Sequence, residues 1–122
     1  MVFGSRQLTF LAVIASFTPS IVLAHAHLVS QTPAADVIVT PAPTELRLSF
    51  SEGIEPGFSG VTLLGPQLQK LVTGKVQLAQ GDAKTLIVPL KTVPTEGDWQ
   101  VDWHVVSVDG HKTHGSYRFH VK

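Results

Sequence analysis

The sequence predicts an all-β fold for residues 25–122, a two-sheet β-sandwich of about seven strands with immunoglobulin-like architecture. First, apolar residues in this stretch do not recur at the spacing of an α-helix over about ten residues. Second, short runs that alternate apolar and polar residues are separated by glycine, proline and aspartate at intervals of about ten residues. A small β-barrel is the alternative arrangement of the same strands.

Each expected strand is bounded by such turn formers. In residues 45–51, Leu46, Leu48 and Phe50 alternate with polar residues, as in a strand with one buried face. Residues 117–121 repeat this alternation at the end of the chain. The other expected strands cover residues 27–31, 61–64, 75–79, 85–90 and 99–108.

Three prolines, Pro33, Pro41 and Pro43, interrupt the segment after the first expected strand. Proline cannot donate a hydrogen bond to a neighbouring strand. We therefore expect this segment to cross between the sheets as an extended loop without regular pairing.

Residues 1–24 have the features of a secretory signal peptide. Arg6 is the only charged side chain in this segment, and the apolar run over residues 8–17 is too short to span a bilayer. Small residues before the expected cleavage site favour a cut after Ala24, which makes His25 the first residue of the mature chain. Cleavage two residues later and an uncut membrane anchor are the alternatives.

The composition of the expected mature chain narrows its function. Residues 25–122 suffice for one small domain and not for two. Without Arg6 they carry 8 lysines and arginines against 9 aspartates and glutamates, so no basic surface for nucleic acid or anionic lipid is expected. The chain has no cysteine and its single methionine is Met1, so thiolate and thioether ligands are both missing from the mature domain.

Six histidines in so short a chain suggest a metal site, although most single histidines are solvated or packed residues. Alternation places His120 on the solvent side of the last strand. It also places His104 with Asp102 on the face opposite Trp99 and Trp103, which we interpret as core residues. Neither histidine is therefore expected to be a metal ligand.

The stretch from Val108 to Gly115 is expected to be a loop on a rigid sandwich, where binding residues often lie. Asp109 and His111 are separated by one residue, so both side chains can reach a single ion. An Asp-Gly turn with a solvated histidine is the structural alternative. Lys112 and His114 are most simply solvated loop residues.

The N-terminal His25 and this loop are expected to meet at one edge of the sandwich. The α-amine and imidazole of His25, the imidazole of His111 and the carboxylate of Asp109 would then form the nitrogen-rich tetragonal set that Cu(II) favours. Because nitrogen ligands must be deprotonated to bind, Cu(II) affinity is expected to fall steeply below about pH 6–7.

Four segments together resemble the CopC copper-resistance family, in particular its YobA-like branch. They are the expected mature start HAHLVSQTPA, the strand end LSFSE, the turn FSG at residues 58–60 and the run VDWHVVSVDGH at residues 101–111. The resemblance covers residues 25–122. It implies a Greek-key β-sandwich or barrel in the periplasm that binds Cu(II) through the residues that correspond here to His25, Asp109 and His111.

The resemblance also bears on the terminus and the partners. Mature chains of the family begin His-x-x-Leu, which matches His25 to Leu28 and favours cleavage after Ala24. His27 matches a histidine found in part of the family and is a further candidate ligand. The implied partners are the copper ion and, as a candidate, an inner-membrane copper transporter of the CopD type, and the implied state is a monomer.

The chain departs from the founding members of the family in one respect. Those members carry a second, methionine-rich Cu(I) site, whereas residues 25–122 contain no methionine. A protein that binds only Cu(II) is therefore expected. A local chelate is an alternative in which the amine, two backbone amides and the His27 imidazole of His-Ala-His bind Cu(II) without Asp109 or His111.

Three functions follow from these observations. A soluble protein that sequesters or delivers Cu(II) in the periplasm, without enzymatic activity, is the expected one. A copper monooxygenase with a histidine brace is disfavoured by the small domain, by an aspartate where oxygen must bind and by the few aromatic residues. A metal-independent sandwich that binds another protein is the third.

Overall fold

The computed structural model describes residues 25–122 of the chain. The expected signal peptide, residues 1–24, lies outside the described residues. Within the described part, no helix is long and apolar enough to cross a membrane.

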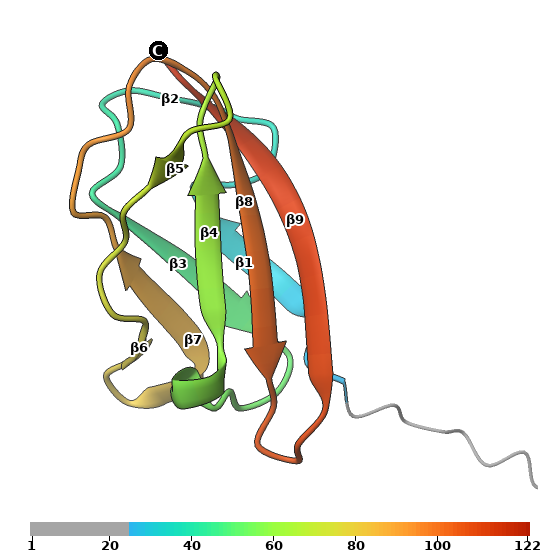
Figure 1. The fold of residues 1–122 in the computed structure, drawn as a ribbon. Helices are drawn as coiled ribbons and strands as arrows, with labels where there is room; N and C mark the ends of the chain where they lie inside the picture. Colours follow the sequence, from blue (N-terminus) through green and yellow to red (C-terminus); the bar gives the residue numbers. More distant parts are fainter. Residues whose placement is uncertain (1–24) are drawn as a thin grey trace, which may run out of the picture.

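Two β-sheets pack face to face, which confirms the predicted β-sandwich (Figure 1). A four-stranded sheet has the order β1-β3-β7-β6 and a five-stranded sheet has the order β2-β9-β8-β4-β5. All neighbouring strands are antiparallel except β2 and β9, which are parallel. The strands are β1 (Leu28–Thr32), β2 (Ile38–Val39), β3 (Glu45–Phe50), β4 (Gly60–Leu64), β5 (Lys70–Leu71), β6 (Gln77–Ala79), β7 (Asp82–Pro89), β8 (Gly97–Val106) and β9 (Lys112–Val121), and one 3-10 turn, η1, covers Pro56–Phe58.

The core consists of the apolar residues that alternate along the strands, as the sequence predicts. In β3, Leu46 and Leu48 are fully buried and Phe50 nearly so. Burial of these apolar surfaces supplies most of the stabilising free energy of such a fold. From the five-stranded sheet, β8 and β9 contribute the other side of the core, namely Trp99, Val101, Trp103, Val105, Tyr117, Phe119 and Val121.

The predicted strands are observed with shifted ends, and two short strands were missed. β5 was missed, and β2 lies inside the proline-containing segment, where we expected no regular pairing. That expectation is wrong for Ile38 and Val39, which pair with His120 and Val121 of β9. The segment does cross between the sheets, since β1 and β3 belong to one sheet and β2 to the other.

The hairpin of β8 and β9 positions the candidate site. Its ten residue pairs run from Gly97 opposite Val121 to Val106 opposite Lys112. The turn of this hairpin lies at the end of the sandwich where the described chain begins, and the C-terminus lies at the opposite end (Figure 1). The fold therefore brings residue 25 and the turn after β8 to the same end.

Candidate metal centre

Three hydrogen bonds fix the start of the described chain on the sandwich. Ala26 is fully buried, and its carbonyl accepts a hydrogen bond of 2.7 Å from the Thr113 hydroxyl of β9. The amide of His27 donates to the Ser51 hydroxyl at 3.0 Å, and the amide of Ser51 donates to the His27 carbonyl at 3.0 Å. The backbone next to His25 is thus held between the end of β3 and the start of β9.

The turn between β8 and β9 is equally well fixed. The amide of Gly110 donates to the Ser107 carbonyl at 2.8 Å, and the amide of Ser107 donates to the His111 carbonyl at 2.9 Å. Gly110 has φ of 90°, a conformation that only glycine adopts readily. The Asp-Gly turn that the sequence suggested is therefore present, and it carries Asp109 and His111 instead of excluding them from a site.

His25 and His111 face each other across these two segments. Their ring centroids are 4.8 Å apart, and the rings meet edge to face at 76°. The Nδ1 atom of His25 is buried and has no hydrogen-bond partner among the described residues. An unpartnered buried nitrogen is unfavourable, so this atom is suited to a ligand that the protein itself does not supply.

Asp109 contacts His111 directly. Its Oδ2 lies 3.0 Å from His111 Nδ1, while its Oδ1 accepts hydrogen bonds from the Ser107 hydroxyl and from the His111 amide. The hydrogen bond from Ser107, followed by that from the His111 side chain, lowers the pKa of Asp109 to about 2. The carboxylate is therefore ionised at neutral pH. Because His111 Nδ1 faces Asp109, Nε2 is the nitrogen left to bind a metal.

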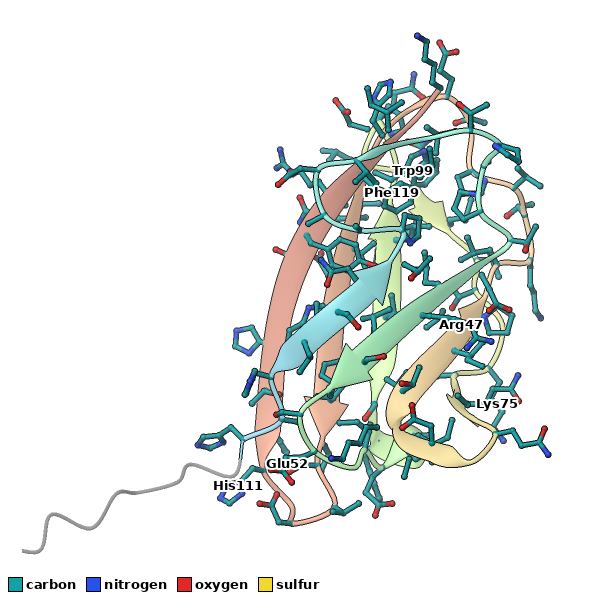
Figure 2. The ribbon with its side chains drawn as sticks, turned by 180° about the vertical axis from the view of Figure 1, so that it is seen from behind. Arg47, Glu52, Lys75, Trp99, His111 and Phe119 are labelled. Carbon is teal, nitrogen blue, oxygen red and sulfur yellow. The ribbon has the colours of Figure 1, made fainter. Side chains whose placement is uncertain are left out.

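Figure 2 shows His111 at the turn end of the sandwich, whereas Trp99 and Phe119 lie toward the other end. Three predicted ligands, His25, Asp109 and His111, are thus gathered at that end. Within residues 25–122, no three histidine, aspartate or glutamate side chains are already arranged around one metal position. Asp109 is turned toward His111, and a rotation of its carboxylate is needed for it to reach a shared ion.

His27 has a different partner. Its ring is exposed, and its Nδ1 lies 3.1 Å from the Ser51 hydroxyl. The structure therefore gives His27 a contact with the residue that follows β3, while His25 contacts His111.

The remaining histidines lie on the outer face of the five-stranded sheet. His104 and His120 face outward, as alternation predicts, and His120 Nδ1 lies 2.7 Å from Asp98 Oδ1. Lys112 and His114 are exposed, as predicted, but their expected place in a loop is wrong, because both lie within β9. His114 pairs with His104 across the hairpin.

The site is also held by three hydroxyl side chains that were not predicted from the sequence. They are Ser51, Ser107 and Thr113. Thr113 gave a usable signal: it shares the inward-facing alternation of Tyr117 and Phe119, and a polar residue at such a position needs a partner. Ser107 gave a weaker signal, because serine side chains at turns commonly form local hydrogen bonds, without indicating Asp109 as the partner. Ser51 gave none, because its partner is 24 residues away in the chain.

Comparison with known proteins agrees with this architecture. The model of the CopC domain family matches residues 28–122. The chain is 53% identical to protein YobA of Escherichia coli K12 over 105 residues, covering 86% of this chain and 84% of that protein. It is 36% identical to copper resistance protein C of Pseudomonas syringae pv. tomato, covering 81% of this chain and 82% of the relative.

A solved structure extends the similarity to the fold. The crystal structure of PcoC, a methionine-rich copper resistance protein from Escherichia coli, matches with a TM-score of 0.71 at 33% sequence identity. The match covers 81% of this chain and the whole of that structure. The chain therefore belongs to the CopC domain family.

Proposed function

We propose that the mature protein binds one Cu(II) ion through His25, Asp109 and His111 and acts in copper tolerance. The observation that carries this proposal is the buried Nδ1 of His25, which lacks a partner among the described residues and belongs to a ring 4.8 Å from that of His111. The names of the relatives, which are copper resistance proteins, support copper as the metal.

The donor set fits Cu(II). Cleavage after Ala24 would give His25 a free α-amine, which can close a chelate ring on the metal together with Nδ1 of the same residue. His111 offers Nε2, and the ionised Asp109 offers an oxygen. Nitrogen donors with one carboxylate suit Cu(II) better than the other common divalent ions. Before the metal binds, the contact of Asp109 with His111 holds that imidazole in one orientation, and the carboxylate would then rotate to reach the ion. His27 would be a close neighbour or a further ligand.

The chain lacks the soft ligands that Cu(I) prefers. It contains no cysteine, and its single methionine is residue 1. PcoC, in contrast, is described as methionine-rich. We therefore propose a carrier of Cu(II) alone, without a separate Cu(I) site.

We further propose that the protein works as a monomer in the periplasm, where it sequesters Cu(II) or delivers it to an inner-membrane transporter of the CopD type. The features of residues 1–24 support export. Binding without catalysis is expected, because an aspartate oxygen on the metal would occupy a position that an oxygen-activating enzyme needs open.

Titration of Cu(II) into protein with a verified His25 terminus, followed by electron paramagnetic resonance, tests the proposed site. His111→Ala and Asp109→Ala should each weaken Cu(II) binding by roughly 100-fold, because each removes a ligand or its orienting partner. His120→Ala is the matched control, since it removes another histidine that contacts an aspartate, and it should leave the affinity of this site unchanged.

Unchanged affinity in both site variants would contradict the proposal. It would favour the local chelate of His-Ala-His, which uses the His27 imidazole and backbone amides. His27→Ala separates the two modes further, because it abolishes the local chelate but leaves His25, Asp109 and His111 of the fold-dependent site in place.

A further inference from the structure

The outer face of the five-stranded sheet carries a second pair of histidines. His104 of β8 and His114 of β9 are directly opposite each other in the hairpin. Both residues are exposed. Opposite residues on one face of an antiparallel pair have Cβ atoms about 4.5–5.5 Å apart, so their side chains can reach a common point.

The neighbouring strand leaves room for these rings. Gly60 of β4 is the partner of His104 on its other side. A Cβ atom at Gly60 would lie only 2.7 Å from the His104 ring, so the ring occupies space that any other residue would fill. Both histidines line a surface hollow of about 340 Å³, together with Asp102 and Trp103.

The nitrogens of both rings are available. Among the described residues, neither His104 nor His114 is engaged in a side-chain hydrogen bond or an ion pair, in contrast to His27, His111 and His120. The oxygen Oδ1 of nearby Asp102 accepts a hydrogen bond from Gln100 at 2.8 Å, and no hydrogen bond to Oδ2 is found among the described residues.

We propose that His104 and His114 form a second metal site, which clamps a borderline divalent ion such as Cu(II) between two imidazoles. Imidazole is a ligand common to Cu(II), Ni(II) and Zn(II), and Cu(II) is bound most tightly of these by a given set of nitrogen donors. The site requires rotation about the side-chain bonds of these two exposed histidines, which must turn the His104 ring from its place over Gly60 toward His114 and bring two nitrogens to about 2.0–2.1 Å from one ion.

This second site differs from the first in strength and in origin. Two side-chain nitrogens without a terminal amine leave several coordination positions of the ion open, so binding is weaker and exchange is faster. The site needs neither a free N-terminus nor the turn residues, and it is therefore independent of the proposed function of His25 and His111.

Cu(II) titration of the mature protein beyond one equivalent tests this proposal. We expect a second equivalent to bind, with its own electron paramagnetic resonance signal and quenching of Trp103 fluorescence. His104→Ala and His114→Ala should each weaken the second equivalent by about tenfold or more and leave the first unchanged. His120 lies on the same face of β9 as His114, so His120→Ala is the control and should change the binding of neither equivalent.

The His111→Ala variant distinguishes failure of this proposal from failure of the first site. In that variant the tight equivalent is weakened by roughly 100-fold, and the second one should persist and remain sensitive to His114→Ala. A second equivalent that is unaffected by both His104→Ala and His114→Ala, or equally reduced by His120→Ala, would overturn the second site. Circular dichroism of each variant checks that the exposed substitutions leave the sandwich folded.

Discussion

The β8–β9 hairpin carries an aspartate–histidine contact at each end, and only the one at the turn has the surroundings of a metal site. At the turn, Asp109 Oδ2 lies 3.0 Å from His111 Nδ1. At the open end of the hairpin, where β8 begins and β9 ends, Asp98 Oδ1 lies 2.7 Å from His120 Nδ1. The two contacts use the same kinds of atoms at similar distances. Their local chemistry therefore does not distinguish them.

The surroundings do distinguish them. The Asp109 side chain is 36% exposed and is held by the Ser107 hydroxyl, whereas the Asp98 side chain is 82% exposed. A third donor, His25, joins only the pair at the turn. An aspartate–histidine pair becomes a candidate metal site when a distant segment adds a further, partly buried ligand to it.

The largest expected effect comes from extending one end of the chain. One alanine added before His25 removes the terminal amine from the chelate, and Cu(II) affinity of the first site should fall by two or more orders of magnitude, roughly 3 kcal/mol. One alanine added after Lys122, at the other end of the hairpin, should change nothing. Competition titration with a chelator of known strength measures both. Equal affinities would contradict a role for the amine.

Asp109→Asn should lower Cu(II) affinity by about 10- to 100-fold, and Asp98→Asn should leave it unchanged. Hydrogen bonds from Ser107 and His111 lower the pKa of Asp109 to about 2, so its carboxylate stays ionised over the whole range in which histidines titrate. The fall in affinity below about pH 6–7 should therefore come from protonation of nitrogen ligands.

A pH series of both proteins checks this assignment. Asp109→Asn should weaken binding by a similar factor at each pH from about 5 to 8 without moving the midpoint. The contribution of the ionised Asp109 to stability is present above the unfolded-state value near pH 4 and is lost only as pH falls toward 2. A loss of affinity in the variant that grows or shrinks strongly between pH 5 and 8 would contradict this assignment.

Thr113→Val removes the hydrogen bond that holds the Ala26 carbonyl beside the site. A partly buried carbonyl left without its donor costs about 1–3 kcal/mol, so Cu(II) affinity, stability or both should fall by about that amount. Thr40→Val is the control, because the Thr40 hydroxyl bonds the Lys122 carbonyl at an exposed position at the other end. Thermal unfolding measures stability and Cu(II) titration measures affinity. Similar losses in both variants would show that the hydrogen bond from Thr113 to Ala26 has no special role at the site.

The smallest expected effect is a gain of weak Cu(II) binding at the end of the hairpin that carries Asp98 and His120. Ile38 of β2 is 66% exposed and pairs with His120, which in turn pairs with Asp98. Ile38→His should add the missing second imidazole and create weak Cu(II) binding, roughly micromolar to millimolar. The measurement belongs in a His111→Ala, His114→Ala background, where Cu(II) binding at the two other proposed sites is weakened. No gain there would mean that adjacency of two imidazoles and a carboxylate is not sufficient.

Much of the fold could be predicted from the sequence because alternation is a local property. The side chains of a strand point to opposite faces with a period of two, so the buried positions of β3, β8 and β9 follow from the residue types alone. The pairing of the proline-containing segment was harder to predict. β2 consists of two residues that pair with a strand more than 80 residues away, and no local pattern reports such a contact.

The sequence by itself determined the two-sheet class, the apolar core, the lack of soft metal ligands and the presence of an aspartate and a histidine around a glycine turn. Only the tertiary structure decided that His25 faces His111, that Thr113 and Ser51 hold the segment beside it, and that His104 lies opposite His114. The physical reason is the register of the strands. Turn geometry and the packing of the whole core decide which residues of different strands face each other. A shift of a strand by one residue would turn all of its side chains to the other face.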